Sequence, residues 1–295
     1  MSQPLLGAVF DLDGTLAPDT TTQLLIDLGM DPDPFWARVA ERMQHGWDHV
    51  LAYMTQLMEG GGPGTVSLTR ERMVRVGSHA HLMPGVLELV GALNNSLAQV
   101  GWGLECYLVS SGLLPLVESL PIASGLAGIW ASDFDYDIGG RPIAIKNVIS
   151  FTDKTRPLIA ISKGISCETL ASHPFAVNDR ASAFRIPFSQ MIFVGDGFTD
   201  IPCFSLVKRG GGLAIAVHDG SPGSQARADS LLSDRRVRAI AEADFRPDGA
   251  GMRAVLDGLL QLTEAATGGL VQGSGTSAPR PSPAAPREVS GGRSS

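Results

Sequence analysis

Residues 5–16 of this 295-residue chain read LLGAVFDLDGTL, and this stretch decides the fold. Its first six residues form a short apolar run that ends at two aspartates and a glycine, which is typical of a buried parallel strand leading into a loop. Similar runs recur at residues 104–109 (LECYLV), 191–194 (MIFV) and 213–217 (LAIAV). Helical patterns lie between these runs, so the sequence predicts an α/β fold with a parallel sheet.

Two of the runs lead directly into pairs of carboxylates. Asp11 and Asp13 follow the first run, and Asp196 and Asp200 follow the run at 191–194. Because ligands of open α/β sheets bind beyond the carboxyl ends of the strands, we expect these four side chains to share one site. Four carboxylates in one place repel each other and call for a cation, and oxygen-only ligands favour Mg²⁺.

Two further elements complete a set of groups suited to phosphoryl transfer. Ser110, Ser111 and Gly112 follow the run at 104–109, where a hydroxyl and adjacent backbone N–H groups suit an anionic oxygen. Lys154 and Lys163 are the two candidates for a neutralising cation. A carboxylate nucleophile, a metal, hydrogen-bond donors and a lysine together indicate phosphoryl transfer.

The order of these elements resembles the haloacid dehalogenase superfamily of Mg²⁺-dependent phosphohydrolases. Its four motifs match DLDGTL at 11–16, LVSSG at 108–112, the lysine region at 154–164 and VGDGFTD at 194–200. The long helical interval between the first two motifs resembles the cap of the phosphoserine-phosphatase-like branch. The resemblance implies a Rossmann-like three-layer α/β fold, with the first motif on the central strand of the sheet and an inserted all-helical cap.

The resemblance also implies roles for the four aspartates. Asp11 is expected to attack phosphorus, forming an aspartyl-phosphate, and to bind Mg²⁺. Asp13 is expected to protonate the leaving alcohol and then to activate water, while its backbone carbonyl binds the metal. Asp196 is expected to bind the metal directly, and Asp200 to bind it through water or to orient a partner.

The remaining implied roles concern the phosphoryl group. Ser110 is expected to bond a phosphoryl oxygen, helped by the N–H groups of Ser111 and Gly112. Lys163 is favoured as the catalytic lysine because a glycine follows it, as in the phosphoserine-phosphatase-like branch, and Lys154 is the alternative.

The chain divides into three predicted parts. Residues 1–16 and 81–266 form the catalytic core, residues 17–80 the helical cap, and residues 267–295 a disordered tail rich in Gly, Ser, Pro and Ala. Within the core, residues 132–148 alternate about Gly139 and Gly140 and predict a small β-hairpin.

Composition limits the partners and the compartment. With 23 basic and 30 acidic residues the net charge is −7, and there is no basic run to bind nucleic acid or an anionic membrane. The three cysteines are widely spaced, which disfavours a disulfide framework and a zinc site and favours a reducing, cytoplasmic location. The resemblance to the phosphohydrolases implies a small phosphorylated metabolite as the partner. The sequence carries no indication of oligomeric state.

The leading hypothesis is a Mg²⁺-dependent phosphomonoester hydrolase. A phosphotransferase or dehalogenase of the same fold and a non-catalytic regulatory protein are the alternatives. Asp13 counts against a dehalogenase, because dehalogenases of the superfamily generally lack this second acid. Thr20 stands where the resembling phosphoserine phosphatases have a glutamate for the substrate amine, which argues against phosphoserine as substrate.

Overall fold

The computed structural model describes residues 3–60, 64–181 and 183–272, and a seven-stranded sheet forms its centre. The strand order is β4-β3-β2-β1-β5-β6-β7, so β1 is central, and every neighbouring pair except β3 and β4 is parallel. The strands are β1 (Leu5–Phe10), β2 (Gly103–Leu113), β3 (Gly128–Tyr136), β4 (Pro142–Asn147), β5 (Met191–Gly195), β6 (Leu213–His218) and β7 (Ala239–Glu242). The predicted α/β class is confirmed.

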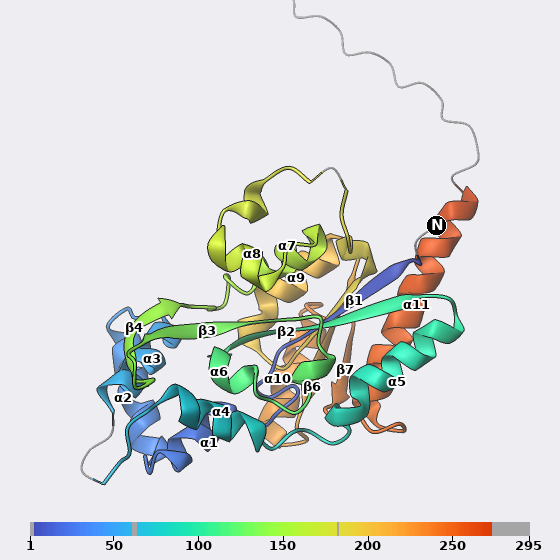
Figure 1. The fold of residues 1–295 in the computed structure, drawn as a ribbon. Helices are drawn as coiled ribbons and strands as arrows, with labels where there is room; N and C mark the ends of the chain where they lie inside the picture. Colours follow the sequence, from blue (N-terminus) through green and yellow to red (C-terminus); the bar gives the residue numbers. More distant parts are fainter. Residues whose placement is uncertain (1–2, 61–63, 182, 273–295) are drawn as a thin grey trace, which may run out of the picture.

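Helices cover both faces of the sheet (Figure 1). Helices α5 (Val86–Gln99) and α11 (Ala250–Gln272) pack on the face to which β1 contributes Leu6, Ala8 and Phe10. Helices α7 (Thr155–Lys163), α9 (Ile201–Arg209) and α10 (Pro222–Ser233) pack on the face to which β1 contributes Val9. This alternation of buried side chains is what a strand covered on both faces requires.

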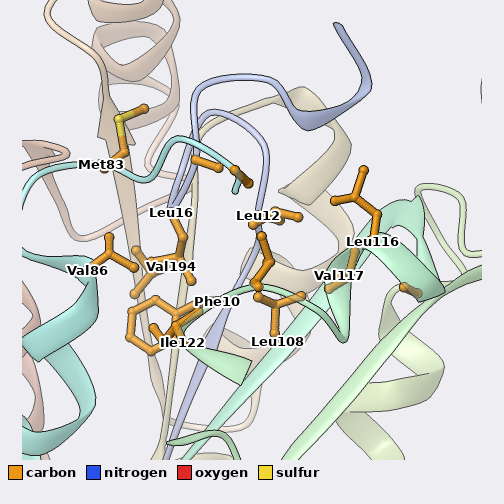
Figure 2. Packing of buried hydrophobic residues seen from close by; sticks show 14 of the residues in the cluster. Phe10, Leu12, Leu16, Met83, Val86, Leu108, Leu116, Val117, Ile122 and Val194 are labelled. Carbon is orange, nitrogen blue, oxygen red and sulfur yellow. The ribbon is translucent and has the colours of Figure 1, made fainter. Parts of the chain in front are cut away.

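The loop after β1 is anchored by its leucines. Leu12 and Leu16 are fully buried and pack with Phe10 and its neighbours in the core shown in Figure 2. Burial of each leucine contributes about 1.5–3 kcal/mol, which holds the loop in one conformation. Because Leu12 faces the core, Asp11 and Asp13 on either side of it are left to line a cavity.

Four helices lie between β1 and α5 in the chain, within the predicted insertion. They are α1 (Thr20–Asp27), α2 (Pro32–Gln44), α3 (His49–Glu59) and α4 (Arg70–Ser78). Side chains of Asp19, Asp31, Asp48 and Thr69 cap their N-termini, which stabilises each short helix.

The insertion packs closely against the rest of the protein. Helix α4 contacts α6 (Leu114–Val117), where a Cβ on Gly77 would lie 2.1 Å from the carbonyl oxygen of Leu116, so only glycine allows this approach. Strands β3 and β4 form the predicted antiparallel hairpin, and the Arg70 N–H donates to the carbonyl of Gly140 in its turn, at 2.8 Å. The hairpin thereby reaches the inserted helices (Figure 1).

The C-terminal boundary differs from the sequence prediction. Helix α11 continues to Gln272, so residues 267–272, which were predicted to belong to the tail, are helical. The rest of the predicted tail, 273–295, lies outside the described residues. Among the helices of the described part, none combines the length and the apolar character needed to cross a membrane.

Candidate active site

A buried lysine lies between two of the predicted site aspartates. The N–H of Asp11 donates to the carbonyl of Val194 at 2.9 Å, which fixes the backbone just beyond the end of β1. The ammonium of Lys154 lies 2.9 Å from Oδ1 of Asp11 and donates to Oδ1 of Asp200 at 2.8 Å. Burial lowers the pKa of Lys154, but Asp11 and Asp200 outweigh it and raise that pKa, so the ammonium stays charged.

The structure brings three carboxylates together. Oxygens of Asp11, Asp196 and Asp200 all lie within 4.8 Å of one another. Burial, followed by repulsion from Asp200, raises the pKa of Asp196 to about 6, against the opposing effect of Arg227 at 3.4 Å. Burial and Asp200 also raise the pKa of Asp11 well above its usual range. The three carboxylates therefore carry more negative charge than the two neighbouring cations, Lys154 and Arg227, offset.

This donor set fits a hard divalent cation such as Mg²⁺, which prefers carboxylate oxygens. Asp11 and Asp196 line the cavity described below, so they are the side chains that would hold the ion. Asp200 is fully buried, and its oxygens accept from Lys154 and, at 3.3 Å, from the N–H of Gly197. Asp200 is thus arranged to fix Lys154 and the loop after β5.

Gly14 allows the first and last carboxylate motifs to meet. Its φ is +78°, and a Cβ at this position would lie 2.5 Å from Cγ of Asp196. Both the left-handed backbone and the lack of space require glycine. The conformation of residue 14 therefore determines whether Asp196 can approach the loop that carries Asp11 and Asp13.

Asp13 is held from the first turn of α1. The N–H and hydroxyl of Thr20 both donate to Oδ1 of Asp13, at 2.6 and 2.8 Å. Burial raises the pKa of Asp13 to about 6, while the two bonds from Thr20 oppose the shift. A carboxyl with this pKa exchanges protons near neutral pH, as a general acid and base must.

Ser110, Ser111 and Gly112 form the irregular end of β2. The pairing of β2 with β3 shifts register between Val109 and Leu113, so these residues lie within the strand and not in a turn after it. Ser111 and Gly112 line the cavity. Ser110 is buried, and its hydroxyl accepts a hydrogen bond from the N–H of Gly112 at 2.9 Å. Ser110 thus supports the backbone that faces the cavity.

The structure corrects the expectation for Lys163. Its ammonium donates to the carbonyls of Val177 and Asp179, both at 2.6 Å, and does not reach the carboxylate cluster. Lys163 lies in the last turn of α7 and Gly164 caps that helix with φ +74°. A lysine followed by glycine is common at the C-terminus of a helix, so the pair Lys163 and Gly164 marks the end of α7. Lys154, at the N-terminal end of the same helix, is the lysine of the site.

The site opens into a cavity of about 320 Å³ between the sheet and the inserted helices. Trp36 on α2 and His49 and Tyr53 on α3 line it, together with Phe151 from the loop before α7. The hydroxyl of Tyr53 donates to the carbonyl of Ser111 at 2.6 Å, which ties α3 to the end of β2.

Sequence analysis did not identify Tyr53 or Arg227, nor the bond of Thr20 to Asp13. Thr20 carried a local signal, because it begins a helix a few residues after the first motif. Arg227 lies in α10 and meets Asp196 from 31 residues along the chain. Tyr53 meets Ser111 from 58 residues away. Contacts at such separations have no signature in a single sequence.

Comparison with known families agrees with this geometry. A family model described as haloacid dehalogenase-like hydrolase matches residues 8–205, which is more than half of the chain. The chain therefore belongs to the haloacid dehalogenase-like hydrolases. The match includes all four aspartates of the site and Lys154.

Individual relatives are distant. An uncharacterized protein of Borreliella burgdorferi is 25% identical, and the alignment covers 82% of this chain and 92% of the relative. A probable phosphoserine phosphatase from Vibrio cholerae has a TM-score of 0.52 at 19% identity, covering 89% of this chain and 67% of the other. A substrate-bound phosphoserine phosphatase has the same TM-score and identity, covering 83% and 97%.

A haloacid dehalogenase family hydrolase from Salmonella enterica serovar Typhi has a TM-score of 0.52 at 17% identity, and the alignment covers 76% of this chain and 66% of the other. At these identities the likeness is one of fold. In fold, the protein resembles the phosphoserine phosphatases.

Proposed function

We propose that the protein is a Mg²⁺-dependent phosphomonoester hydrolase that acts on a small phosphorylated metabolite through an aspartyl-phosphate. One observation carries the proposal: Asp11, paired with the buried Lys154, lines the same cavity as Asp13, whose pKa is raised to about 6. A nucleophile and a proton donor within reach of one phosphorus atom are what ester cleavage requires.

In the first step, a carboxylate oxygen of Asp11 attacks phosphorus and the bond from phosphorus to the ester oxygen breaks. Asp13 gives its proton to that oxygen, and the alcohol leaves. Lys154 favours the ionised form of Asp11. The backbone N–H of Ser111 would stabilise charge on the phosphoryl oxygens, while the N–H of Gly112 donates to the hydroxyl of Ser110.

In the second step, Asp13 is a carboxylate and takes a proton from water. The water oxygen attacks phosphorus, the bond to Asp11 breaks, and inorganic phosphate is released. Thr20 keeps Asp13 in one orientation through both transfers, because its two bonds go to a single oxygen of the carboxylate. The other oxygen is left to handle the proton.

The metal would be held by the carboxylates of Asp11 and Asp196 and by the backbone carbonyl of Asp13, with Asp200 acting through Lys154 or water. A bound Mg²⁺ would supply positive charge that offsets both the carboxylate cluster and the phosphoryl group. The shortage of positive charge in the cluster supports this assignment.

We further propose that residues 17–80 act as a cap on a core formed by 1–16 and 81–266. Thr20 and Tyr53 are the contacts that support this proposal, since each connects an inserted helix directly to a site residue. Closure over the cavity would exclude water during the first step. A cytoplasmic location also stays a proposal, supported by the cysteine pattern.

The test is phosphate release from 4-nitrophenyl phosphate, measured with Mg²⁺ and with EDTA. Asp11→Asn should lower kcat by on the order of 10⁴ or more, since it removes the nucleophile. Asp229→Asn is the matched control, because Asp229 is exposed on α10 and lies outside the cavity lining. Full activity in Asp11→Asn, or activity that is unchanged by EDTA, would overturn the mechanism.

A further inference from the structure

Helices α2 and α3 and the loop before α7 contribute aromatic rings to one end of the cavity, which we call the aromatic wall: Trp36, His49, Tyr53 and Phe151. The ring centroids of Trp36 and His49 are 6.0 Å apart, and those of His49 and Phe151 are 6.4 Å apart. Tyr53 lies 6.3 Å from Trp36 and bonds to the backbone of Ser111. The wall therefore begins directly beside the proposed phosphate site.

Charged groups outside the carboxylate cluster are already engaged with the protein. Asp19 accepts from the N–H and hydroxyl of Thr22, as the cap of α1. Asp219 accepts in the same way from Ser221, and Arg227 pairs with Asp196. Within the part of the chain that the structure describes, α2 and α3 contribute only aromatic side chains to the cavity lining. Recognition at this end therefore relies on rings and not on ion pairs.

The orientation of the rings distinguishes two kinds of ligand. The planes of Trp36 and His49 differ by 9°, and those of His49 and Phe151 by 28°, so these three rings are near-parallel. The Tyr53 ring is tilted by 54° from Trp36 and by 52° from His49, and its hydroxyl is tied to the backbone of Ser111. Near-parallel rings suit a flat group in stacked contact, whereas an organic ammonium needs ring faces that converge on one point. Burial lowers the pKa of His49, against the opposing effect of Asp48, so His49 acts as an uncharged ring at neutral pH.

The volume of the cavity limits the size of the ligand. Ligand cavities span about 300–1,000 Å³, and this one, at about 320 Å³, is at the small end. We infer that the alcohol released by the enzyme carries a single flat aromatic ring, which packs against the aromatic wall while its phosphate lies beside Asp11. This inference rests on the proposed function and names the class of substrate for the same site.

The test compares benzyl phosphate with cyclohexylmethyl phosphate, which share the phosphate and the CH₂–O bond and differ in the flatness of the ring. We expect kcat/KM to favour benzyl phosphate by about 3- to 10-fold, the size of an aromatic pair interaction. Trp36→Leu should remove most of this preference, and Trp36→Phe should keep it. If Trp36→Leu does not fold, the preference of Trp36→Phe for benzyl phosphate provides the test instead.

Trp47→Leu is the matched control. Trp47 lies between α2 and α3, is 44% exposed, contacts Arg42 and is outside the cavity lining, so its replacement should leave the preference unchanged. Equal rates for the two esters, a preference for choline phosphate or phosphoserine, or an unchanged preference in Trp36→Leu would overturn the inference and leave the proposed function standing. No phosphate release from any of the esters would overturn the proposed function and this inference together.

Discussion

Replacement of Lys154 by methionine is the sharpest test of the site. The side chain is 1% exposed and its ammonium lies 2.9 Å from Asp11 and 2.8 Å from Asp200. Methionine fills similar space but leaves two buried carboxylates without their cation. Each charge-assisted bond contributes about 1.5–3 kcal/mol, and loss of one partner of a buried ion pair costs about 3–5 kcal/mol. We therefore expect Lys154→Met to lower the free energy of unfolding by about 3–5 kcal/mol.

Activity should fall further than stability alone explains. Loss of a preorganised charge at a phosphoryl site lowers kcat by about 10²- to 10³-fold. Urea unfolding gives the first quantity, and phosphate release from 4-nitrophenyl phosphate, at a temperature where the variant is folded, gives the second.

Lys163→Met provides the control, because Lys163 bonds two backbone carbonyls away from the site. Lys163→Met should lower the free energy of unfolding by about 1–3 kcal/mol and leave kcat near that of the unmodified protein. The reverse result, an active Lys154→Met and an inactive Lys163→Met, would refute the assignment of the lysine.

Two further predictions concern the carboxylate cluster. Gly14→Ala should abolish most activity and destabilise the fold by about 1–3 kcal/mol, since it adds both backbone strain and a clash with Asp196. The control is Gly46→Ala, where φ is +87° and nothing lies within 4 Å of the new Cβ. This replacement should add backbone strain without a clash, and the variant should keep its activity. Equal effects of the two replacements on activity would contradict this account. Because the pKa of Asp196 is about 6 in the fold against 3.8 in the unfolded chain, the folded protein without metal binds more protons between these values, and its stability falls as pH rises through them. Mg²⁺ needs the ionised carboxylate, so it should raise the Tm more at pH 8 than at pH 5, and Asp196→Asn should remove the difference; a Tm increase that is equal at both pH values would refute the metal assignment.

Much of the fold followed from local patterns. The apolar runs at 5–10, 104–109, 191–194 and 213–217 all became strands of the sheet, because short apolar runs that end at turn residues favour strands buried on both faces. The hairpin around Gly139 and Gly140 was also predicted. Boundaries were less accurate: β2 extends to Leu113 and α11 to Gln272, because local signals define the end of an element less sharply than its presence.

The choice between the two lysines shows where the sequence stops being informative. Both lie in one short region, and the motif alone favoured Lys163. In the structure the two residues are at opposite ends of α7, and only Lys154, at the N-terminal end, points between Asp11 and Asp200. The direction of a helix relative to the sheet depends on which of its faces packs on the core, which is a property of the whole fold.

The sequence by itself determined the class of fold, the order of the four motifs and the carboxylates that follow β1 and β5, because each depends on residues close together in the chain. Only the tertiary structure decided that Lys154 is the buried cation, that Thr20 holds Asp13, and that aromatic rings of the insertion face the site. These features join segments separated by several to more than a hundred residues, and packing of the core, not local preference, sets the distances between them.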